Sequence, residues 1–203
     1  MRNRILEGFK EIAFSTGFYR ATVGELSSRT GISKRTIYRY FRSKDEMVES
    51  IMDQILVSIG EKVDAEINSC ENPVEKVVRL VQAVSQNLKI INPLILQDIQ
   101  KYYPHIWNRI EKFRAEKARM IATMILTGSK QGYFRETIPE IFITALQSGI
   151  RDVINPSFLL KNNLTLEQAV PALFTIFLYG IASDESKKAD ILRPLLNPEN
   201  PGS

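Results

Sequence analysis

The chain has 203 residues, of which 44% are hydrophobic and 25% are charged, with one cysteine and one histidine. This composition is typical of a globular protein with a real core and excludes a fibrous or disordered chain. One cysteine excludes an internal disulfide, and one cysteine with one histidine excludes a metal site of the usual spacing, so we expect neither a metal nor a cofactor.

Positive charge is concentrated at the N-terminal end. Residues 1–44 hold ten Lys and Arg against three Glu, a net charge of +7, whereas residues 45–203 hold 17 cations against 20 acids. Such asymmetry is expected of a nucleic-acid-binding segment joined to a neutral or acidic body. A basic solvated surface without a partner is the alternative, and charge alone leaves both open.

The first residues do not have the pattern of a targeting segment. In MRNRILEGFKEIAF, charges interrupt every apolar run, so the stretch lacks the continuous apolar region of a signal peptide. No window approaches the roughly 18 apolar residues of a membrane-spanning helix. We therefore expect a cytoplasmic protein without a membrane segment.

Two helices are predicted within the first thirty residues. Apolar residues recur at helical spacing over 5–13, and Gly17 suits the left-handed position that ends a helix. In the stretch TVGE, Thr22 can accept from the amide of Glu25 while Glu25 reaches back to the amide of Thr22, which is a capping box. This second helix is expected to end near Thr30.

A third helix follows after a tight turn. Gly31 permits the sharp turn, and Ser33 is a good N-cap for a helix that runs to about Tyr40. Two short helices joined in this way form a helix-turn-helix.

A helical wheel of this third helix divides its side chains into two arcs. The cationic arc holds Lys34, Arg35, Tyr38 and Arg39, and the apolar arc holds Ile37, Tyr40 and Phe41. A merely solvated face normally mixes charges of both signs, and the cationic arc has no carboxylate. Such a helix fits the major groove of double-stranded DNA, where Arg35 can pair with a guanine edge while Lys34 and Tyr38 reach phosphates.

The segments Thr22–Leu26, Gly31–Phe41 and Ser43–Met47 together resemble the DNA-binding domain of the TetR (tetracycline repressor) family, over residues 4 to about 51. The resemblance implies phosphate contacts from Thr22, Tyr38, Tyr40 and Lys44, and a base-approaching helix start formed by Ser33, Lys34, Arg35 and Thr36. Many members have a small residue where Arg35 stands, so Arg35 is expected to read a base that those members do not read.

The rest of the chain is predicted to be helical. The expected helices cover about 44–69, a segment from Pro73 to Asn92, a shorter segment before Pro104, a long helix that closes within 128–132, and the ranges 139–154 and 166–181. No alternating apolar segment of convincing length indicates a strand. The sequence therefore predicts an all-α chain without a sheet.

The last of these helices points to a second subunit. In the range 166–181 almost every residue is apolar, and a helix that is apolar all round must be covered on all sides. Together with the range 139–154 it can form half of a four-helix bundle between two subunits. The alternative is a buried central helix of a monomer; in the resembled family, the last two long helices form a dimer interface. A twofold dimer predicts an inverted-repeat operator.

We divide the chain into a DNA-binding domain at 1–46, a helical ligand-binding and dimerisation domain at 47–183, and a loosely held tail at 184–203. The resemblance implies a regulator, most often a repressor, that responds to a small-molecule effector. Candidate effector contacts, chosen as aromatic, methionine or scattered polar positions, are Gln86, Tyr103, Trp107, Phe113, Met120, Gln147 and Arg151.

The sequence also bears on two other classes of function. The chain contains no GxSxG, phosphate-binding loop, CxxC or HExxH motif, and its single histidine restricts acid–base chemistry, so we expect no enzymatic activity. A DNA-binding regulator controlled by a protein partner, without a small-molecule ligand, is the remaining alternative, and a body without a cavity would favour it.

Overall fold

Ten helices make up the part of the chain that the computed structural model describes, residues 1–89 and 91–183. They are α1 (Arg2–Thr16), α2 (Val23–Thr30), α3 (Lys34–Tyr40), α4 (Lys44–Asn68), α5 (Pro73–Leu88), α6 (Pro93–Tyr102), α7 (Pro104–Lys130), α8 (Pro139–Val153), α9 (Pro156–Lys161) and α10 (Leu166–Ile181). An isolated bridge joins Phe134 and Ala182, and these residues form no strand. The predicted all-α architecture is confirmed, and the predicted tail lies outside the described residues.

The predicted caps build the helix-turn-helix. The Thr22 hydroxyl accepts from the amide of Glu25 at 3.1 Å, which starts α2, and the Ser33 hydroxyl accepts from the amide of Thr36 at 3.1 Å, which starts α3. Between the two helices Gly31 adopts φ 69° and ψ 10°, the left-handed conformation that glycine adopts without a steric cost. The three predicted N-terminal helices are confirmed.

Two details of this region differ from the sequence prediction. Only the Thr22 half of the capping box is among the described hydrogen bonds. Gly17 ends α1 with φ 92° and ψ 152°, so its φ is positive but its conformation is extended rather than left-handed helical. The extended exit directs the chain toward α6, where the amide of Tyr19 donates to Asp98 Oδ2 at 2.8 Å.

The body helices begin where asparagine is followed by proline. The side chains of Asn72, Asn92 and Asn155 accept from amides in the first turns of α5, α6 and α9, and the following proline fits the first turn because its missing N–H needs no partner there. The short helix α9 was not predicted, although Asn155–Pro156 repeats the signal that starts α5 and α6. The other predicted body helices are confirmed, with ends that differ by at most four residues, at the C-terminal end of α5.

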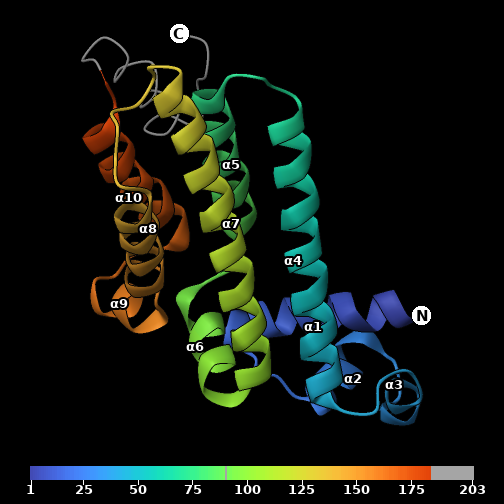
Figure 1. Cartoon of the computed structure of the whole chain (residues 1–203). Coiled ribbons are helices and arrows are strands. Elements are labelled where there is room, and N and C mark those ends of the chain that lie inside the picture. Colours follow the sequence, from blue (N-terminus) through green and yellow to red (C-terminus); the bar gives the residue numbers. More distant parts are fainter. Residues whose placement is uncertain (90, 184–203) are drawn as a thin grey trace, which may run out of the picture.

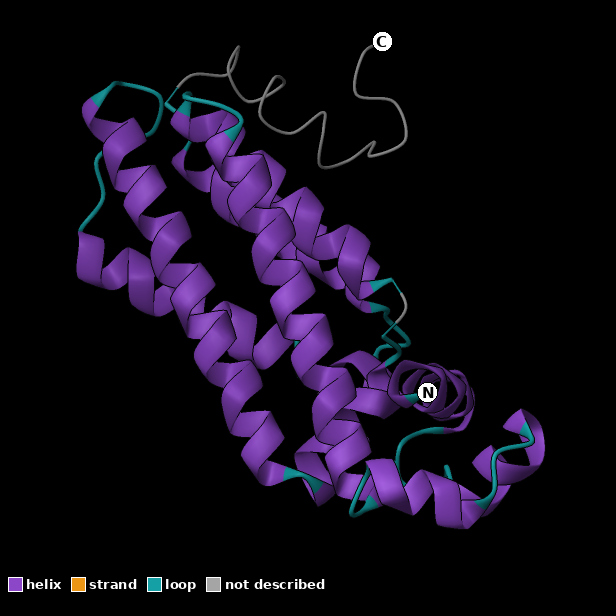
Figure 2. Ribbon diagram, turned by 90° about the vertical axis from the view of Figure 1, so that its right-hand side faces the viewer, coloured by secondary structure: helices purple, strands orange, loops and turns teal. Residues whose placement is uncertain are grey.

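The long helices of the body lie side by side above the N-terminal helices. In Figure 1, α4, α5 and α7 run roughly parallel or antiparallel, while α8 and α10 lie on the side of α5 and α7 away from α4. Figure 2 shows the same bundle of helices turned by 90°. The N-terminal end of α4 packs on α1, and the rest of α4 packs on α5 and α7. One helix therefore belongs to both the N-terminal region and the body. In the described ranges, no helix is long and apolar enough for a membrane span.

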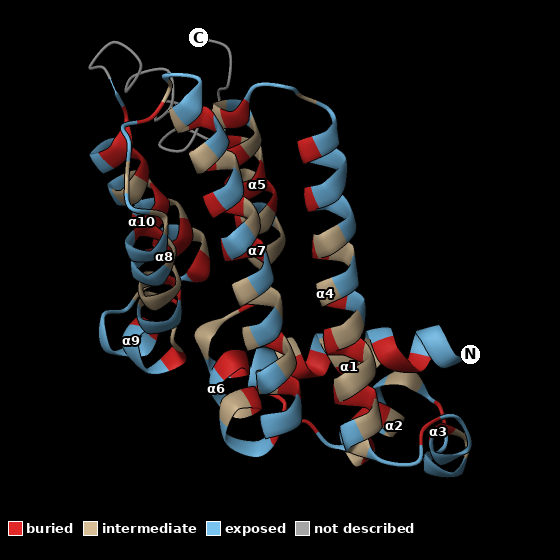
Figure 3. Ribbon diagram, viewed as in Figure 1, coloured by how far each residue is buried: buried red, intermediate tan, exposed pale blue. Residues whose placement is uncertain are grey.

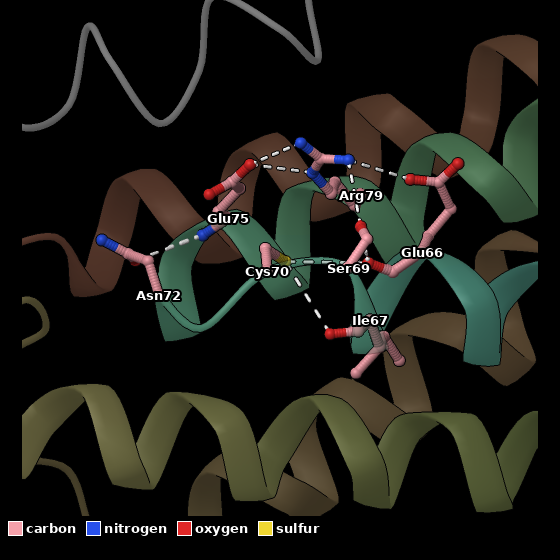
Figure 4. A network of polar contacts seen from close by, with 7 residues as sticks. All are labelled: Glu66, Ile67, Ser69, Cys70, Asn72, Glu75 and Arg79. Carbon is pink, nitrogen blue, oxygen red and sulfur yellow. Dashed lines mark hydrogen bonds and ion pairs between the residues drawn. The ribbon is translucent and has the colours of Figure 1, made fainter.

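Polar contacts hold the far end of α4 to α5 (Figure 4). The Arg79 guanidinium on α5 donates to Glu75 at 2.6 and 2.8 Å, to Glu66 at 3.2 Å and to Ser69 at 3.2 Å. The thiol of Cys70 lies beside this network and donates to the carbonyl of Glu66 at 3.7 Å, and burial raises its pKa. These contacts fix the two helices at one end.

Candidate DNA interface and effector cavity

The surface of α3 presents the predicted cationic arc. Lys34, Arg35 and Arg39 are exposed together with Tyr38, whereas Ile37 is fully buried on the opposite side of α3, which packs on α2. No carboxylate pairs with these three cations among the described residues. The arrangement leaves their charge available to phosphate and base edges.

A corner beside α3 brings together three groups that can bind a phosphate. The side chain of Lys34 reaches across to α2. Its Nζ lies 3.5 Å from the point where a Cβ atom on Gly24 would be, and Thr22 Oγ1 lies 3.7 Å from the same point. This point is also the N-terminus of α2, where unpaired amides and the helix dipole favour an anion. Thr22 and Lys34 are thus neighbours, although twelve positions apart in sequence.

The remaining predicted residues of α3 have several environments. Ser33 and Thr36 form the cap together, with their hydroxyl oxygens 2.9 Å apart. Tyr40 was assigned by the helical wheel to the apolar anchors, but its side chain is 37% exposed, and the Arg39 guanidinium lies 5.5 Å from its ring centroid. The wheel assignment is wrong because α3 ends at Tyr40 and Phe41, already extended, occupies the core.

Lys44 lies at the start of α4 and makes an internal contact. Its Nζ donates to the carbonyl of Tyr19 at 2.8 Å, and burial lowers its pKa while Asp45 and Asp98 act in the opposite direction. An ammonium has three N–H donors, so this bond leaves two for a phosphate. The same side chain also ties the α1–α2 connection to α4.

Several other cations of the N-terminal segment contact the protein itself. Arg4 donates to the carbonyl of Thr30 at 3.0 Å, Arg29 pairs with Glu11 at 3.2 Å, and the Arg2 guanidinium lies 4.6 Å from the centre of the Phe41 ring. The net charge of +7 therefore overstates the charge available to a partner. The available part is concentrated on and around α3.

The helix α6 holds the DNA-binding region from the body side. Asp98 accepts from the amide of Tyr19, and the ring of Tyr19 stacks on that of Tyr102 with centroids 4.2 Å apart. Tyr103 lies at the same junction: it is buried, and burial, aided by Asp45 and Asp98, raises its pKa to about 12. This contact between residues about eighty positions apart has no local sequence signal.

The body contains a cavity of about 90 Å³ between α4, α5, α6, α7, α8 and α10. Its walls are apolar apart from two cations, and the lining includes Met52, Ile55, Leu80, Val84, Phe113, Ile121, Ile150, Val170 and Phe174. Of the predicted effector contacts, Phe113 lies in this wall. An apolar cavity with a few polar groups is the usual form of a small-molecule site.

The other predicted effector contacts lie elsewhere. Gln147 and Arg151 line an open groove of about 500 Å³ next to the cavity, and Gln86 lines a separate surface hollow. The Trp107 ring lies under the Arg114 guanidinium at 5.2 Å, and the sulfur of Met120 lies 3.5 Å from Lys117 Nζ. Tyr103 is at the junction described above.

Arg114 and Lys117 are the two cations in the cavity wall, and sequence reasoning did not select them. Their side chains are 14% and 10% exposed, and burial lowers the pKa of Arg114. The sequence carried a signal, because both stand on the apolar stripe of α7 set by Ile110, Phe113, Ala118 and Ile121. A cation at such a position is buried unless the stripe faces solvent.

An apolar face of α8 and α10 lies on the surface. Ile141 on α8 is 63% exposed, and Ile176 and Tyr179 on α10 are 71% and 50% exposed. Figure 3 shows buried and exposed positions on both helices. The predicted all-round apolar helix is thus covered by its own subunit on one side only.

Among the described residues no cluster of His, Cys, Asp and Glu has the arrangement of a metal site. The geometry is that of a DNA-reading helix-turn-helix joined to a helical body with an internal apolar cavity.

Comparison with known proteins agrees with this geometry. Residues 5–51 match the family model for bacterial regulatory proteins of the tetR family. The uncharacterized HTH-type transcriptional regulator YvaF of Bacillus subtilis is 26% identical over 191 residues, which cover 93% of this chain and all of YvaF. The HTH-type transcriptional repressor KstR2 of Mycolicibacterium smegmatis is 23% identical, over 92% of this chain and 93% of its own.

A solved structure shows the same fold over most of the chain. It is a protein from Saccharomonospora viridis, described as a transcriptional regulator in complex with choline, with 21% identity and a TM-score of 0.72 over 90% of this chain and 98% of that chain. The helix-turn-helix region is therefore similar to the DNA-binding segment of the tetR family, and relatives named as transcriptional regulators or repressors match most of the chain.

Proposed function

We propose that the chain is a homodimeric repressor that binds an inverted-repeat operator and is released from it by a small molecule in the body cavity. The observation that carries the proposal is the cavity itself, which is bounded by α4 and α6. The same two helices contact the DNA-binding region through Lys44 and Asp98. A ligand in the cavity can therefore act on the position of α3 through both helices.

DNA binding is assigned to the residues that surround the cationic arc. Phosphate contacts are assigned to Thr22, Lys34, Tyr38, Tyr40 and Lys44, and base or groove contacts to Ser33, Arg35, Thr36 and Arg39. The exposure of most of these side chains supports the assignment, as does the phosphate corner at the start of α2. The proposed boundary between the domains 1–46 and 47–183 falls inside α4, so the two domains share a continuous helix.

Dimerisation is assigned to the exposed apolar face of α8 and α10. Exposed side chains such as Ile141 and Ile176 are stabilised when a second copy covers them, since burial of apolar surface yields roughly 25 cal/mol per Å². Two helices from each subunit form a four-helix bundle. The twofold axis then places two α3 helices about one DNA turn, roughly 34–36 Å, apart when bound.

Release from DNA follows from linkage. A ligand that binds the DNA-incompetent arrangement more tightly lowers operator affinity by its differential affinity for the two arrangements. The coupling expected of such a regulator is about 1–3 kcal/mol, and operator DNA must weaken ligand binding by the same factor. The cavity favours this mechanism over control by a protein partner.

Selection from random double-stranded DNA tests the DNA-binding proposal. The purified chain should enrich an inverted repeat whose half-sites are centred about one turn apart. Light scattering on the same sample should give twice the 23.2 kDa chain mass. Enrichment of a single unrepeated site, or a stable monomer at micromolar concentration, would contradict the proposed assembly.

A further inference from the structure

Two charged side chains occupy the wall of an otherwise apolar cavity. Ion burial costs several kcal/mol per charge unless the charge is paired and hydrogen-bonded. Arg114 and Lys117 both come from α7, one turn apart, and both line the cavity together with aliphatic side chains of α4, α5, α8 and α10. Their position needs an explanation, because apolar residues on this stripe would fill the core at less cost.

The partners that the protein provides to Arg114 satisfy part of its guanidinium. Nη1 donates to Glu111 Oε1 at 2.8 Å, and the ring of Trp107 lies 5.2 Å from the guanidinium carbon. A guanidinium has five N–H donors, and the other described hydrogen bonds include none from Nε or Nη2. These nitrogens are also absent from the fully buried, unbonded atoms of the described residues, so they keep some accessible surface.

Lys117 pairs with two carboxylates, and its Nζ also lies 5.4 Å from the centroid of the Phe113 ring. Its Nζ lies 3.5 Å from Asp64 Oδ1, 3.5 Å from Glu116 Oε1 and 3.5 Å from the sulfur of Met120. Charge-assisted hydrogen bonds are normally about 2.7–2.9 Å long. The two carboxylates are also 59% and 61% exposed, so water satisfies them without Lys117. The ammonium thus lies on the α4 side of α7 and adds positive charge near the cavity wall from there.

The charge near Arg114 continues into the adjoining groove. The groove of about 500 Å³ shares Arg114, Ala118 and Ile150 with the cavity, so the two spaces meet at the Arg114 side chain. Lys112 and Arg151 also line the groove, against the single carboxylate of Glu111. An anion at this junction is attracted by the groove as well as by the cavity wall.

We propose that the effector is an apolar group joined to an anion, such as a short- or medium-chain acyl compound, whose apolar part enters the cavity while its anionic end is held by Arg114 at the mouth of the groove. The proposal rests on the proposed effector function of the cavity and names its ligand class. A free carboxylate and a phosphate-bearing thioester share this chemistry.

The volume of the cavity limits the apolar part. An apolar cavity of about 150 Å³ holds benzene, so by proportion the cavity of about 90 Å³ takes roughly four carbon atoms without rearrangement. Longer chains require side chains such as Met52 to move, and a methionine with three rotatable bonds adapts more easily than a branched residue. Suitable probes therefore have apolar chains of about four to eight carbons, from the number that fits the cavity as it is to about twice that number.

Calorimetric titration of the full dimer with charge-matched probes tests the proposal. Butanoate, hexanoate and octanoate form one arm, their coenzyme A thioesters form the second, and the corresponding primary alcohols and choline form the neutral and cationic controls. We expect binding of at least one anionic arm, at least about tenfold tighter than the matched alcohol, because a hydrogen bond to a charged group is stronger than a neutral one. Choline should not bind, since two buried cations repel it.

Substitutions on α7 give the second readout. Arg114→Met should weaken the bound anion about tenfold or more and change alcohol binding by less than about twofold, while Arg114→Lys should retain part of the preference. The matched control is Arg119→Met, on the same helix but exposed and outside both cavity and groove. Each variant is first checked for an unchanged helical spectrum and dimer mass.

The outcomes separate this inference from the proposed function. If acids and alcohols bind equally, or if Arg114→Met leaves the preference for the anion intact, the ligand class is wrong although the cavity remains an effector site. If no probe of any charge binds while the chain still selects an operator and dimerises, the inference is overturned and DNA binding stands. Preference for the thioester arm over the free acids identifies the groove as the site of the phosphate-bearing part.

Discussion

Arg35 is exposed at the second position of α3, directly after the phosphate corner formed by Thr22 and Lys34. An arginine in this position can form a bidentate pair with a guanine, whereas a tyrosine hydroxyl such as that of Tyr38 reaches a phosphate oxygen. The two side chains therefore predict different losses.

Arg35→Ala should reduce discrimination at one operator position by roughly 1–3 kcal/mol, whereas Tyr38→Phe should weaken binding to all sequences alike. Fluorescence anisotropy with the selected operator and its single-base variants, at one salt concentration, measures both effects. Arg119→Ala on α7 serves as a charge-matched control. A uniform loss with Arg35→Ala would assign this side chain to a phosphate instead.

Tyr103 predicts a pH dependence of stability. Its folded pKa of about 12 exceeds the ordinary value near 10, so between these values the unfolded chain loses the phenol proton while the folded chain keeps it. Unfolding then becomes easier as the pH rises. The contribution is fully present below about pH 10 and is lost as the pH approaches 12.

The chain with Tyr103→Phe should lack this loss. Between about pH 9.5 and about pH 11, denaturant titration should show the free energy of unfolding of the parent chain falling by about 1 kcal/mol more than that of the variant. Between about pH 7 and 8 the difference between the two chains should stay constant. Parallel pH profiles up to pH 11 would place the hydroxyl of Tyr103 in solvent.

At the scale of elements, α6 connects the N-terminal region to the body as α4 does. The predicted helix over about 44–69 is present as α4 (Lys44–Asn68), and it runs without a break from the N-terminal region into the body. The second connection is the hydrogen bond from the amide of Tyr19 to Asp98 of α6. Tyr19 lies in a loop and Asp98 in a helix, and neither segment has a sequence pattern that indicates this contact. Local patterns cannot predict such pairings, because they arise only when the body packs.

The same distinction explains the rest of the comparison between sequence and structure. Caps such as Thr22 and Ser33 and starts such as Asn72–Pro73 act within one turn, so the sequence predicts helices and their starts well. The effector cavity depends on which helices meet, and Gln86 and Trp107 were selected by residue type alone. The burial of Arg114 can be predicted from the sequence only because this cation lies on the apolar stripe of α7.

Asp98→Ala should loosen the second connection. The amide of Tyr19 loses its acceptor, which lowers the free energy of unfolding by about 1 kcal/mol and speeds hydrogen exchange at this amide. The amide of Leu26, which bonds to the carbonyl of Thr22 within α2, should keep its exchange rate. Hydrogen exchange measured residue by residue tests this prediction, with Glu61→Ala at an exposed position of α4 as the control. An unchanged exchange rate of the Tyr19 amide would show that the contact with α6 does not stabilise the N-terminal region.

At the scale of the molecule, the exposed face of α8 and α10 predicts assembly. Ile176→Glu places a charge at the centre of the proposed four-helix bundle, where burial of two like charges across the axis is costly. The expected result is a folded monomer of 23.2 kDa by light scattering, with operator affinity reduced because one α3 binds at a time.

Val57→Glu is the matched control. Val57 is 58% exposed on α4, so it tests the same change of side chain on a surface that is outside the proposed bundle. This variant should remain a dimer with unchanged operator affinity. A dimer that survives Ile176→Glu at micromolar concentration would show that the two subunits meet through another face.

The cavity wall begins at Met52, and none of its lining residues comes from α1, α2 or α3. Substitutions that alter which molecule is sensed therefore leave the surface that reads DNA untouched, and the reverse also holds. Descendants of this chain can acquire a new signal while keeping the same set of genes under control. The shared helix α4 makes this independence incomplete, because it packs on α1 and its later turns line the cavity. Inherited change should therefore be slowest where the two regions meet.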